Sequence, residues 1–246
     1  MKKKTKLWLL TGIVAVAVLG GGGYALMNDY VGNNVEIESV IPSGSPSAST
    51  DTAASPAASA AAPSDGAATA VTGEQLNGKW AIADSSNVYF SVTTSKETVN
   101  FVDKAVSGDW TVNVDDPSQT TATGVIDMTA IDSGNSQRDD HVKSADFFDA
   151  GQFPQATFTA GSFEGLPSEW TEGTAYDFTM KGTLNVRGTD KDVTFASKAV
   201  YQKGQLLLSG TTTVTFDDFG MKNPHSVVLS TENDVVVRLE LVLDKS

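Results

Sequence analysis

The stretch YDFTMKGTLNVR, residues 176–187, alternates between apolar and polar side chains along its whole length. In an extended chain one face would carry Tyr176, Phe178, Met180, Gly182, Leu184 and Val186. The other face would carry Asp177, Thr179, Lys181, Thr183, Asn185 and Arg187. Successive side chains of a β-strand point to opposite faces, so this period of two predicts a strand with one buried face and one solvated face.

The same alternation recurs on both sides of this stretch. Five other segments repeat it, through Val88/Phe90/Val92, Trp110/Val112/Val114, Ile126/Met128/Ala130, Thr212/Val214/Phe216 and Val235/Val237/Leu239/Leu241/Leu243. Turn-forming residues separate the segments at Asp115-Asp116-Pro117, Gly165-Leu166-Pro167 and Lys203-Gly204. Many strands with regular turns and little helical periodicity are typical of an all-β antiparallel barrel or sandwich.

One segment interrupts the strand pattern, residues 135–158, which read NSQRDDHVKSADFFDAGQFPQATF. Ser136, followed three residues later by Asp139, has the form of a capping box. Val142, Ala145 and Phe148 then fall on one helical face. We therefore predict a short helix from about Gln137 to Phe147 that lies over one end of the sheet.

The charge balance and the lack of cysteine exclude several classes of function. The net charge is −13, and the 24 acidic and 13 basic residues from Gln75 onward leave −11 within the predicted β-domain. Phosphate binding needs clustered Lys and Arg, so the acidity argues against a nucleic-acid partner. The chain has no cysteine, which excludes disulfides, thiol nucleophiles, Cys-ligated zinc and a lipidated-cysteine anchor.

The N-terminus carries the marks of a membrane segment. Lys2, Lys3, Lys4 and Lys6 precede an uncharged run over residues 7–27, which is long enough to span a bilayer. Residues 7–78 contain no Lys or Arg, so the positive-inside rule places the rest of the chain outside the cytoplasm. A cleaved signal peptide is the alternative, but no small-x-small cleavage site follows the glycines at 20–23. We expect an uncleaved single-pass anchor in the cell membrane.

A low-complexity segment follows the anchor. Residues 43–72 are almost entirely Ala, Ser, Pro, Thr and Gly and include no aromatic residue. Such a segment cannot bury enough apolar area to offset its ordering entropy, which predicts a flexible tether. The predicted organisation is a cytoplasmic basic tail (1–6), a transmembrane anchor (7–27), a linker (28–74) and a β-barrel domain (75–246).

The cluster Arg138-Asp139-Asp140-His141 raises the question of catalysis. His141 would need an acidic partner within hydrogen-bond reach, but adjacent residues on a helix do not face each other. No nucleophile or metal-ligand motif accompanies the cluster, and the chain has only two histidines, which lie far apart in sequence. We therefore expect no catalytic residues, no metal and no cofactor.

The aromatic residues of the interrupting segment allow two interpretations. Phe147, Phe148, Phe153 and Phe158 can plug one end of a barrel, or they can line the mouth of an apolar cavity. Periodicity alone does not separate a filled interior from a hollow one. A filled structural or adhesive barrel thus remains an alternative to a binding protein.

Three separated blocks carry a family resemblance. RDDHVKS at 138–144, with DFFD at 146–149, Phe153-Pro154 and Thr157-Phe158, is similar to the RDxHL, DFFD, aromatic-Pro and TF block of the YceI-like family. GTLNVRG at 182–188 resembles the family's GxLTIRG strand, and Asp218-Phe219-Gly220 resembles its late turn. The resemblance runs from Trp80 to Leu243, and it implies a lipocalin-like barrel of about eight strands that binds polyisoprenoids or related amphiphilic lipids.

Some positions depart from the family pattern. Val142 replaces Leu, Asn185 replaces Thr, Asp190 and Asp192 replace Thr and Pro, and Phe216 occupies a place often held by Arg. If that Arg meets an anionic head group, this chain would recognise a different or less charged one. Arg138 and Arg187 then remain as candidate head-group contacts.

The leading hypothesis is a membrane-tethered barrel that holds an isoprenoid or quinone-like lipid as its ligand. The sequence leaves monomer and homodimer open, and it keeps a hydrolase-like use of residues 138–141 as an alternative. The expected ligand contacts are Phe90, Val112, Ile126, Met128, Arg138, Asp139, His141, Phe147, Phe148, Phe158, Phe178, Met180, Leu184, Arg187, Val214, Val237, Leu239 and Leu241.

Overall fold

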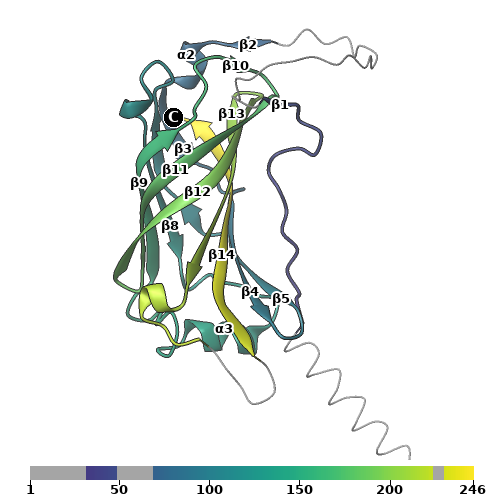
Figure 1. Cartoon of the computed structure of the whole chain (residues 1–246), viewed down its shortest axis with the longest axis vertical. Helices are drawn as coiled ribbons and strands as arrows, with labels where there is room; N and C mark the ends of the chain where they lie inside the picture. Colours follow the sequence, from purple (N-terminus) through teal and green to yellow (C-terminus); the bar gives the residue numbers. More distant parts are fainter. Residues whose placement is uncertain (1–31, 49–68, 224–229) are drawn as a thin grey trace, which may run out of the picture.

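Eight antiparallel strands close into a barrel in the computed structural model, which describes residues 32–48, 69–223 and 230–246 (Figure 1). The strand order is β13-β12-β11-β9-β8-β7-β3-β14, and the pairing of β13 with β14 closes the ring. The strands are β3 (Gly78–Ile82), β7 (Asp109–Val112), β8 (Thr121–Asp127), β9 (Gln155–Glu164), β11 (Ala175–Val186), β12 (Thr189–Gln202), β13 (Gln205–Thr215) and β14 (Thr231–Lys245). This architecture confirms the all-β barrel predicted from the alternating segments.

The long strand β14 serves two neighbours on one of its edges. Its last residues, 243–245, pair with β3, whereas residues 231–240 pair with β4 (Asn87–Thr94). β4 continues into β5 (Thr98–Asp103) as a hairpin, and the short β6 (Val106–Ser107) pairs with β8. The hairpin therefore extends the barrel wall at one end.

Large buried side chains fill the opposite end of the barrel. Trp80 is completely buried, donates its indole N–H to the Leu76 carbonyl over 2.8 Å and meets Tyr201 edge-on at 6.5 Å. Leu243 is also almost completely buried. The helix α2 (Gly73–Leu76), with its Thr72 capping box, and the small sheet of β2 (Ala70–Val71) and β10 (Trp170–Thr171) lie at the same end (Figure 1). We call this end the closed end.

The helix α3 (Ser136–Lys143) lies at the other end of the barrel (Figure 1). It differs from the predicted helix in its start, its end and its cap. Asn135 is the N-cap, and its side chain accepts a hydrogen bond from the Arg138 backbone N–H over 3.1 Å. The capping box predicted for Ser136 and Asp139 is wrong, because the Asp139 carboxylate accepts from Ser133 instead. The helix stops at Lys143 because a turn follows in which the Phe148 N–H returns to the Val142 carbonyl.

Residues 32–48, which we call the strap, lie along the outside of the barrel (Figure 1). The sequence predicted a flexible linker over 28–74, and the structure places this part of it against the barrel wall. The strap ends in β1 (Ser47–Ala48), which pairs in parallel with β11. Its Val40 and Ile41 pack on an apolar patch on the outer wall, formed by Ala175, Val200, Leu207 and Val242. The apolar side chains of the strap distinguish it from the Ala/Ser/Pro-rich segment that follows.

The predicted membrane anchor over 7–27 lies outside the described residues. Within the three described ranges, no helix is both long and apolar enough to cross a bilayer. The anchor therefore stays a prediction from the sequence.

Gly182 lets β9 and β11 approach closely where their register shifts. A Cβ at this position would lie 2.3 Å from the Thr159 carbonyl oxygen and 2.6 Å from the Phe158 ring. The ring can move, but the backbone carbonyl cannot move without breaking the ladder. We predict that Gly182→Ala lowers the free energy of unfolding by about 1–3 kcal/mol, measured by denaturant titration.

Gly161, on the neighbouring strand, provides the matched control. A Cβ there would meet only the Lys181 carbonyl oxygen, at 3.8 Å. Gly161→Ala should therefore change stability by less than about 1 kcal/mol. Equal losses in the two variants would contradict the role assigned to the close approach.

Candidate ligand-binding cavity

An apolar cavity of about 350 Å³ lies inside the barrel, toward the end that carries α3. Pockets that hold small molecules typically measure about 300–1,000 Å³. The lining residues are mostly aliphatic or aromatic. Besides the predicted ones, they include Ile82, Val88, Val92, Val99, Phe101, Val106, Trp110, Ala156, Val186, Phe195, Phe216, Phe219, Met221 and Val235.

The cavity opens toward α3. The closed end is sealed by the buried Trp80, Leu76 and Leu243, whereas the exposed His141 of α3 belongs to the cavity lining. Thr94, at the tip of the β4–β5 hairpin, also lines it. We call the end formed by α3, this hairpin and the 3-10 turn η2 (Asp217–Phe219) the mouth end.

Most of the residues predicted to contact a ligand line this cavity. They are Phe90, Ile126, Met128, Arg138, His141, Phe147, Phe148, Phe158, Met180, Leu184, Val214, Val237, Leu239 and Leu241. They come from six strands, from the turn after β8 that contains Met128, and from the α3 segment, and the fold brings them to one space. Whether each contacts a ligand stays a prediction.

Four predicted residues lie elsewhere. Val112 and Phe178 point inward but belong to the filled part of the core, where Phe178 stacks with Phe163 at 6.4 Å. Asp139 is bound to Ser133. Arg187 sits in the β11–β12 turn and donates to the Ala145 carbonyl over 2.9 Å. Alternation shows which face of a strand points inward, but not how far along the barrel axis each residue lies.

Aromatic rings form the part of the lining next to α3. Phe90 stacks on Phe101 at 4.5 Å and meets Phe148 edge-on at 5.5 Å. Phe147 meets the His141 ring edge-on at 4.8 Å. The rings border a space that side chains do not fill, so of the two interpretations open from the sequence, the structure favours a cavity mouth over a plug. Phe101 was missed, although the run Thr98–Asp103 shows the same alternation in weaker form.

Arg138 belongs to the cavity wall, but its hydrogen bonds go to other parts of the protein. Its guanidinium is nearly buried and donates through Nε to Ser133 Oγ and through Nη2 to the Ser133 carbonyl, both over 2.9 Å. Its Nη1 donates to the Gly32 carbonyl of the strap over 2.9 Å, and the guanidinium carbon lies 5.8 Å from the centre of the Phe101 ring. Arg138 therefore joins the loop before α3, the strap and the cavity wall.

Asp139 serves the same loop. Its Oδ1 accepts the Ser133 backbone N–H over 2.9 Å and also accepts the Ser133 hydroxyl. The carboxylate is buried and committed to Ser133, so it fixes the chain that leads into α3. This geometry does not supply the acid–histidine pair that a general base at His141 would need.

One buried carboxyl near the mouth has an altered affinity for protons. Asp103 is completely buried, its Oδ1 accepts the Ala105 N–H over 2.8 Å, and its Oδ2 has no partner among the described residues. Burial raises the pKa of Asp103 to about 6, against the lowering effect of the Ala105 N–H, while nearby Asp127 raises it and Lys143 lowers it. This carboxyl therefore destabilises the fold when it is charged.

The raised pKa predicts a pH-dependent stability. The folded state holds the proton more tightly than the unfolded chain, so the stabilising contribution is complete below about pH 4 and is lost as the pH rises through about 6. With allowance for solvent screening the loss is about 2 kcal/mol. Asp103→Asn should flatten this dependence and raise the unfolding free energy at pH 7.5, measured by denaturant titration. The exposed Asp84→Asn should do neither, and a wild-type profile that is flat between pH 4 and 7 would contradict the assignment.

Comparisons with known proteins agree with this geometry. The profile of the protein family described as YceI-like domain matches residues 80–243, about two thirds of the chain. Protein YceI of Escherichia coli O157:H7 is 32% identical over 99 residues, 40% of this chain and 48% of that protein. A UPF0312 protein of Shewanella baltica is 30% identical over 125 residues, 47% of this chain and 60% of that protein. The matches thus span about half to three fifths of these relatives.

Solved structures share the fold. BcnA of Burkholderia cenocepacia, 20% identical, superposes with a TM-score of 0.56 over 65% of this chain and 98% of that one. A polyisoprenoid binding domain from Saccharophagus degradans, implicated in plant cell wall breakdown, is 13% identical and gives 0.55 over 68% and 98%. At these identities the likeness concerns the barrel alone.

Proposed function

Because this chain belongs to the YceI-like domain family, we propose that it is an extracytoplasmic binding protein that holds an isoprenoid or another long-chain amphiphilic lipid inside its barrel. The observation that carries the proposal is the cavity of about 350 Å³ with its almost wholly apolar lining. The Saccharophagus domain of the same fold, described as polyisoprenoid binding, supports the same ligand class.

The lining suits a hydrocarbon tail. Burial of each methylene contributes about 0.8 kcal/mol, so a long tail binds tightly without specific polar contacts. Leu184, Val237 and Leu239 are only partly buried by protein, which leaves apolar surface for a ligand to cover. Tail length and branching would then set affinity more than any single residue.

The head group would sit at the mouth end. Arg138 is engaged with Ser133 and Gly32, and the exposed His141 borders the opening. Phe216, at a position often held by Arg in the family, adds apolar surface to the lining instead of charge. These features favour a neutral or weakly charged head group, such as an alcohol or a quinone ring.

We further propose that residues 7–27 anchor the protein in the cell membrane with the barrel on the extracytoplasmic side. The support comes from the uncharged run and the preceding lysines. A barrel held at a bilayer would store, sequester or exchange a membrane lipid without an energy source.

The test is to isolate the full-length protein from a bacterial membrane in mild detergent and to examine it by native mass spectrometry with lipid extraction. We expect a co-purifying isoprenoid or other long-chain lipid at near-equal stoichiometry, or uptake of added polyprenol or quinone. A protein that carries no lipid and takes up neither ligand would sink the proposal.

Binding without turnover is the specific expectation. Asp139 is committed to Ser133 and does not orient His141 as a base, so wild type and His141→Ala should both leave the extracted lipid chemically unchanged. His141 is exposed and the rest of the lining is mostly apolar, so His141→Ala should keep lipid affinity within about threefold of wild type. A lipid that accumulates in modified form with wild type, but not with His141→Ala, would favour the enzyme alternative.

A further inference from the structure

The strap runs the length of the barrel, and its first described residues lie at the mouth end (Figure 1). The Gly32 carbonyl accepts from Arg138 of α3 over 2.9 Å. The Asn33 N–H donates to Glu97 of the β4–β5 turn over 3.1 Å. The side-chain Oδ1 of Asn33 accepts the Asn100 N–H over 2.9 Å. Fifteen residues later, the strap reaches the closed end at β1.

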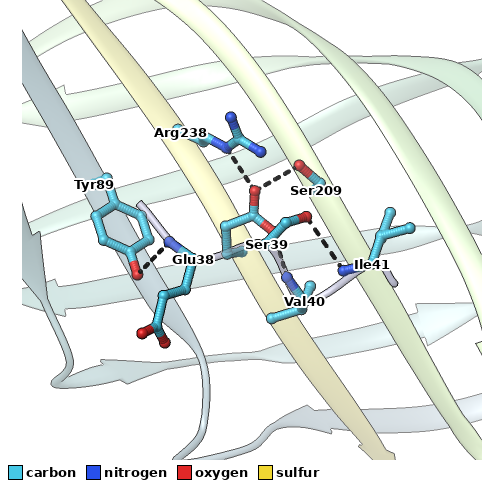
Figure 2. A network of polar contacts seen from close by, with 8 residues as sticks. Glu38, Ser39, Val40, Ile41, Tyr89, Ser209 and Arg238 are labelled. Carbon is cyan, nitrogen blue, oxygen red and sulfur yellow. Dashed lines mark hydrogen bonds and ion pairs between the residues drawn. The ribbon is translucent and has the colours of Figure 1, made fainter. Parts of the chain in front are cut away.

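The middle of the strap is held by a buried carboxylate on the outer wall (Figure 2). Glu240 is completely buried and accepts from the Val40 N–H over 2.9 Å and from the Ser39 hydroxyl over 3.3 Å. From the barrel side it accepts from Ser209 over 2.8 Å and from Arg238 over 2.5 Å. The Tyr89 hydroxyl accepts the Glu38 N–H beside this group. The strap is therefore bound by specific contacts along its length.

The strap decides where the preceding chain leaves the barrel. The first barrel strand, β3, which contains the buried Trp80, begins at the closed end. If residues 28–74 were a free linker, an anchored barrel would hang from its closed end with its mouth in no fixed direction. With the strap bound, the chain before Gly32 departs from the mouth end, next to Arg138 in the cavity wall.

We propose that the strap holds the barrel with its mouth facing the bilayer that carries residues 7–27. Met27 and Gly32 are five residues apart in the sequence, and an extended chain of five residues spans at most about 17 Å. The mouth is thereby confined to the neighbourhood of the head groups, and a lipid tail passes between bilayer and cavity over a short path. This inference rests on the proposed function, since it presumes the anchor and a lipid ligand.

The absence of cysteine allows a direct test by labelling. Ser95→Cys, in the β4–β5 turn, places a label at the mouth end, and Ser168→Cys, before β10, places one at the closed end; both serines are exposed. Each full-length variant is labelled with bimane and reconstituted into phosphatidylcholine/phosphatidylglycerol vesicles that contain head-group spin-labelled lipid. We expect the Ser95→Cys label to be quenched at least twofold more than the Ser168→Cys label.

Release of the strap should abolish this difference. Glu240→Ala removes the central acceptor and should therefore have the full effect. Tyr89→Phe removes only the hydroxyl that receives Glu38 and should reduce the difference partially, which gives a second reading if Glu240→Ala folds poorly. Equal quenching in the wild type, stronger quenching at the closed end, or failure to float with vesicles would overturn the inference.

Quenching measures the orientation of the mouth, and a second measurement reports lipid binding, so either proposal can be refuted without the other. Native mass spectrometry of the same samples reports bound polyprenol or quinone. Bound lipid without preferential quenching at the mouth would refute the orientation alone. Preferential quenching with an empty barrel would refute the lipid-binding function and leave the orientation standing.

Discussion

Val237→Trp should weaken the binding of a long-chain isoprenoid by roughly 1,000-fold while the barrel stays folded. Val237 lies on β14 opposite Phe90, is only partly buried and lines the cavity. An indole at this position would occupy space that a tail otherwise fills. Displacement of about five methylenes costs about 4 kcal/mol, which corresponds to the stated fold-change. The measurement is a titration of purified protein with a fluorescent polyprenol analogue, together with the melting temperature.

The neighbouring residue supplies the control for this prediction. Val236 is 37% exposed and points away from the cavity on the same strand. Val236→Trp should therefore leave affinity within about twofold of wild type. If Val237→Trp folds normally and binds as tightly as Val236→Trp, the ligand does not occupy the cavity.

The barrel was predictable because its strands separate apolar from polar side chains. In β11, the fully buried Met180 lies between the less buried Thr179 and the exposed Lys181, as the alternation predicts. The family resemblance is confirmed over the range expected. The sequence did not predict β12 because three of its first four residues are charged, although it alternates near Val193 and Phe195.

The sequence predicted which kinds of residue line the candidate site, but not how far along the barrel axis each of them lies. Alternation identified Met180 and Leu184 as inward residues, and both line the cavity. It identified Phe178 equally well, yet Phe178 lies in the filled part of the core, because depth along the barrel depends on strand tilt and register. The roles of Arg138 and Asp139 depend on Ser133, a residue that no motif singled out.

The strap was the least predictable element. Residues 28–74 have the composition of a tether, and the only alternation in the strap, Val35-Glu36-Ile37-Glu38, is too short to predict a bound segment. Its binding depends on Glu240, which stands among the outward-facing positions of β14 and resembles an ordinary solvated glutamate in the sequence. Only the structure shows that the strap buries it.

Glu240→Ala should lower the free energy of unfolding by about 3 kcal/mol and release the strap. The side chain accepts hydrogen bonds from Ser39, Val40 and Ser209 and pairs with Arg238, which is 35% exposed. Removal of one partner of a fully buried ion pair typically costs 3–5 kcal/mol, and the exposure of the arginine places this case at the lower end. The measurement combines denaturant titration of the full-length protein with hydrogen exchange at the Val40 amide.

Two variants separate the binding of the strap by Glu240 from a general effect of lost charge. Glu232→Ala, at an exposed position of the same strand, should change stability by less than about 0.5 kcal/mol and leave the exchange at Val40 unaltered. Ser39→Ala removes one strap contact while the carboxylate stays paired, so it should cost only about 1 kcal/mol and accelerate that exchange modestly. If Glu240→Ala loses stability while the Val40 amide stays protected, the carboxylate stabilises the barrel wall alone. The strap would then be held by its apolar contacts and its two ends, and the orientation of the mouth would depend on Arg138 and Glu97 instead.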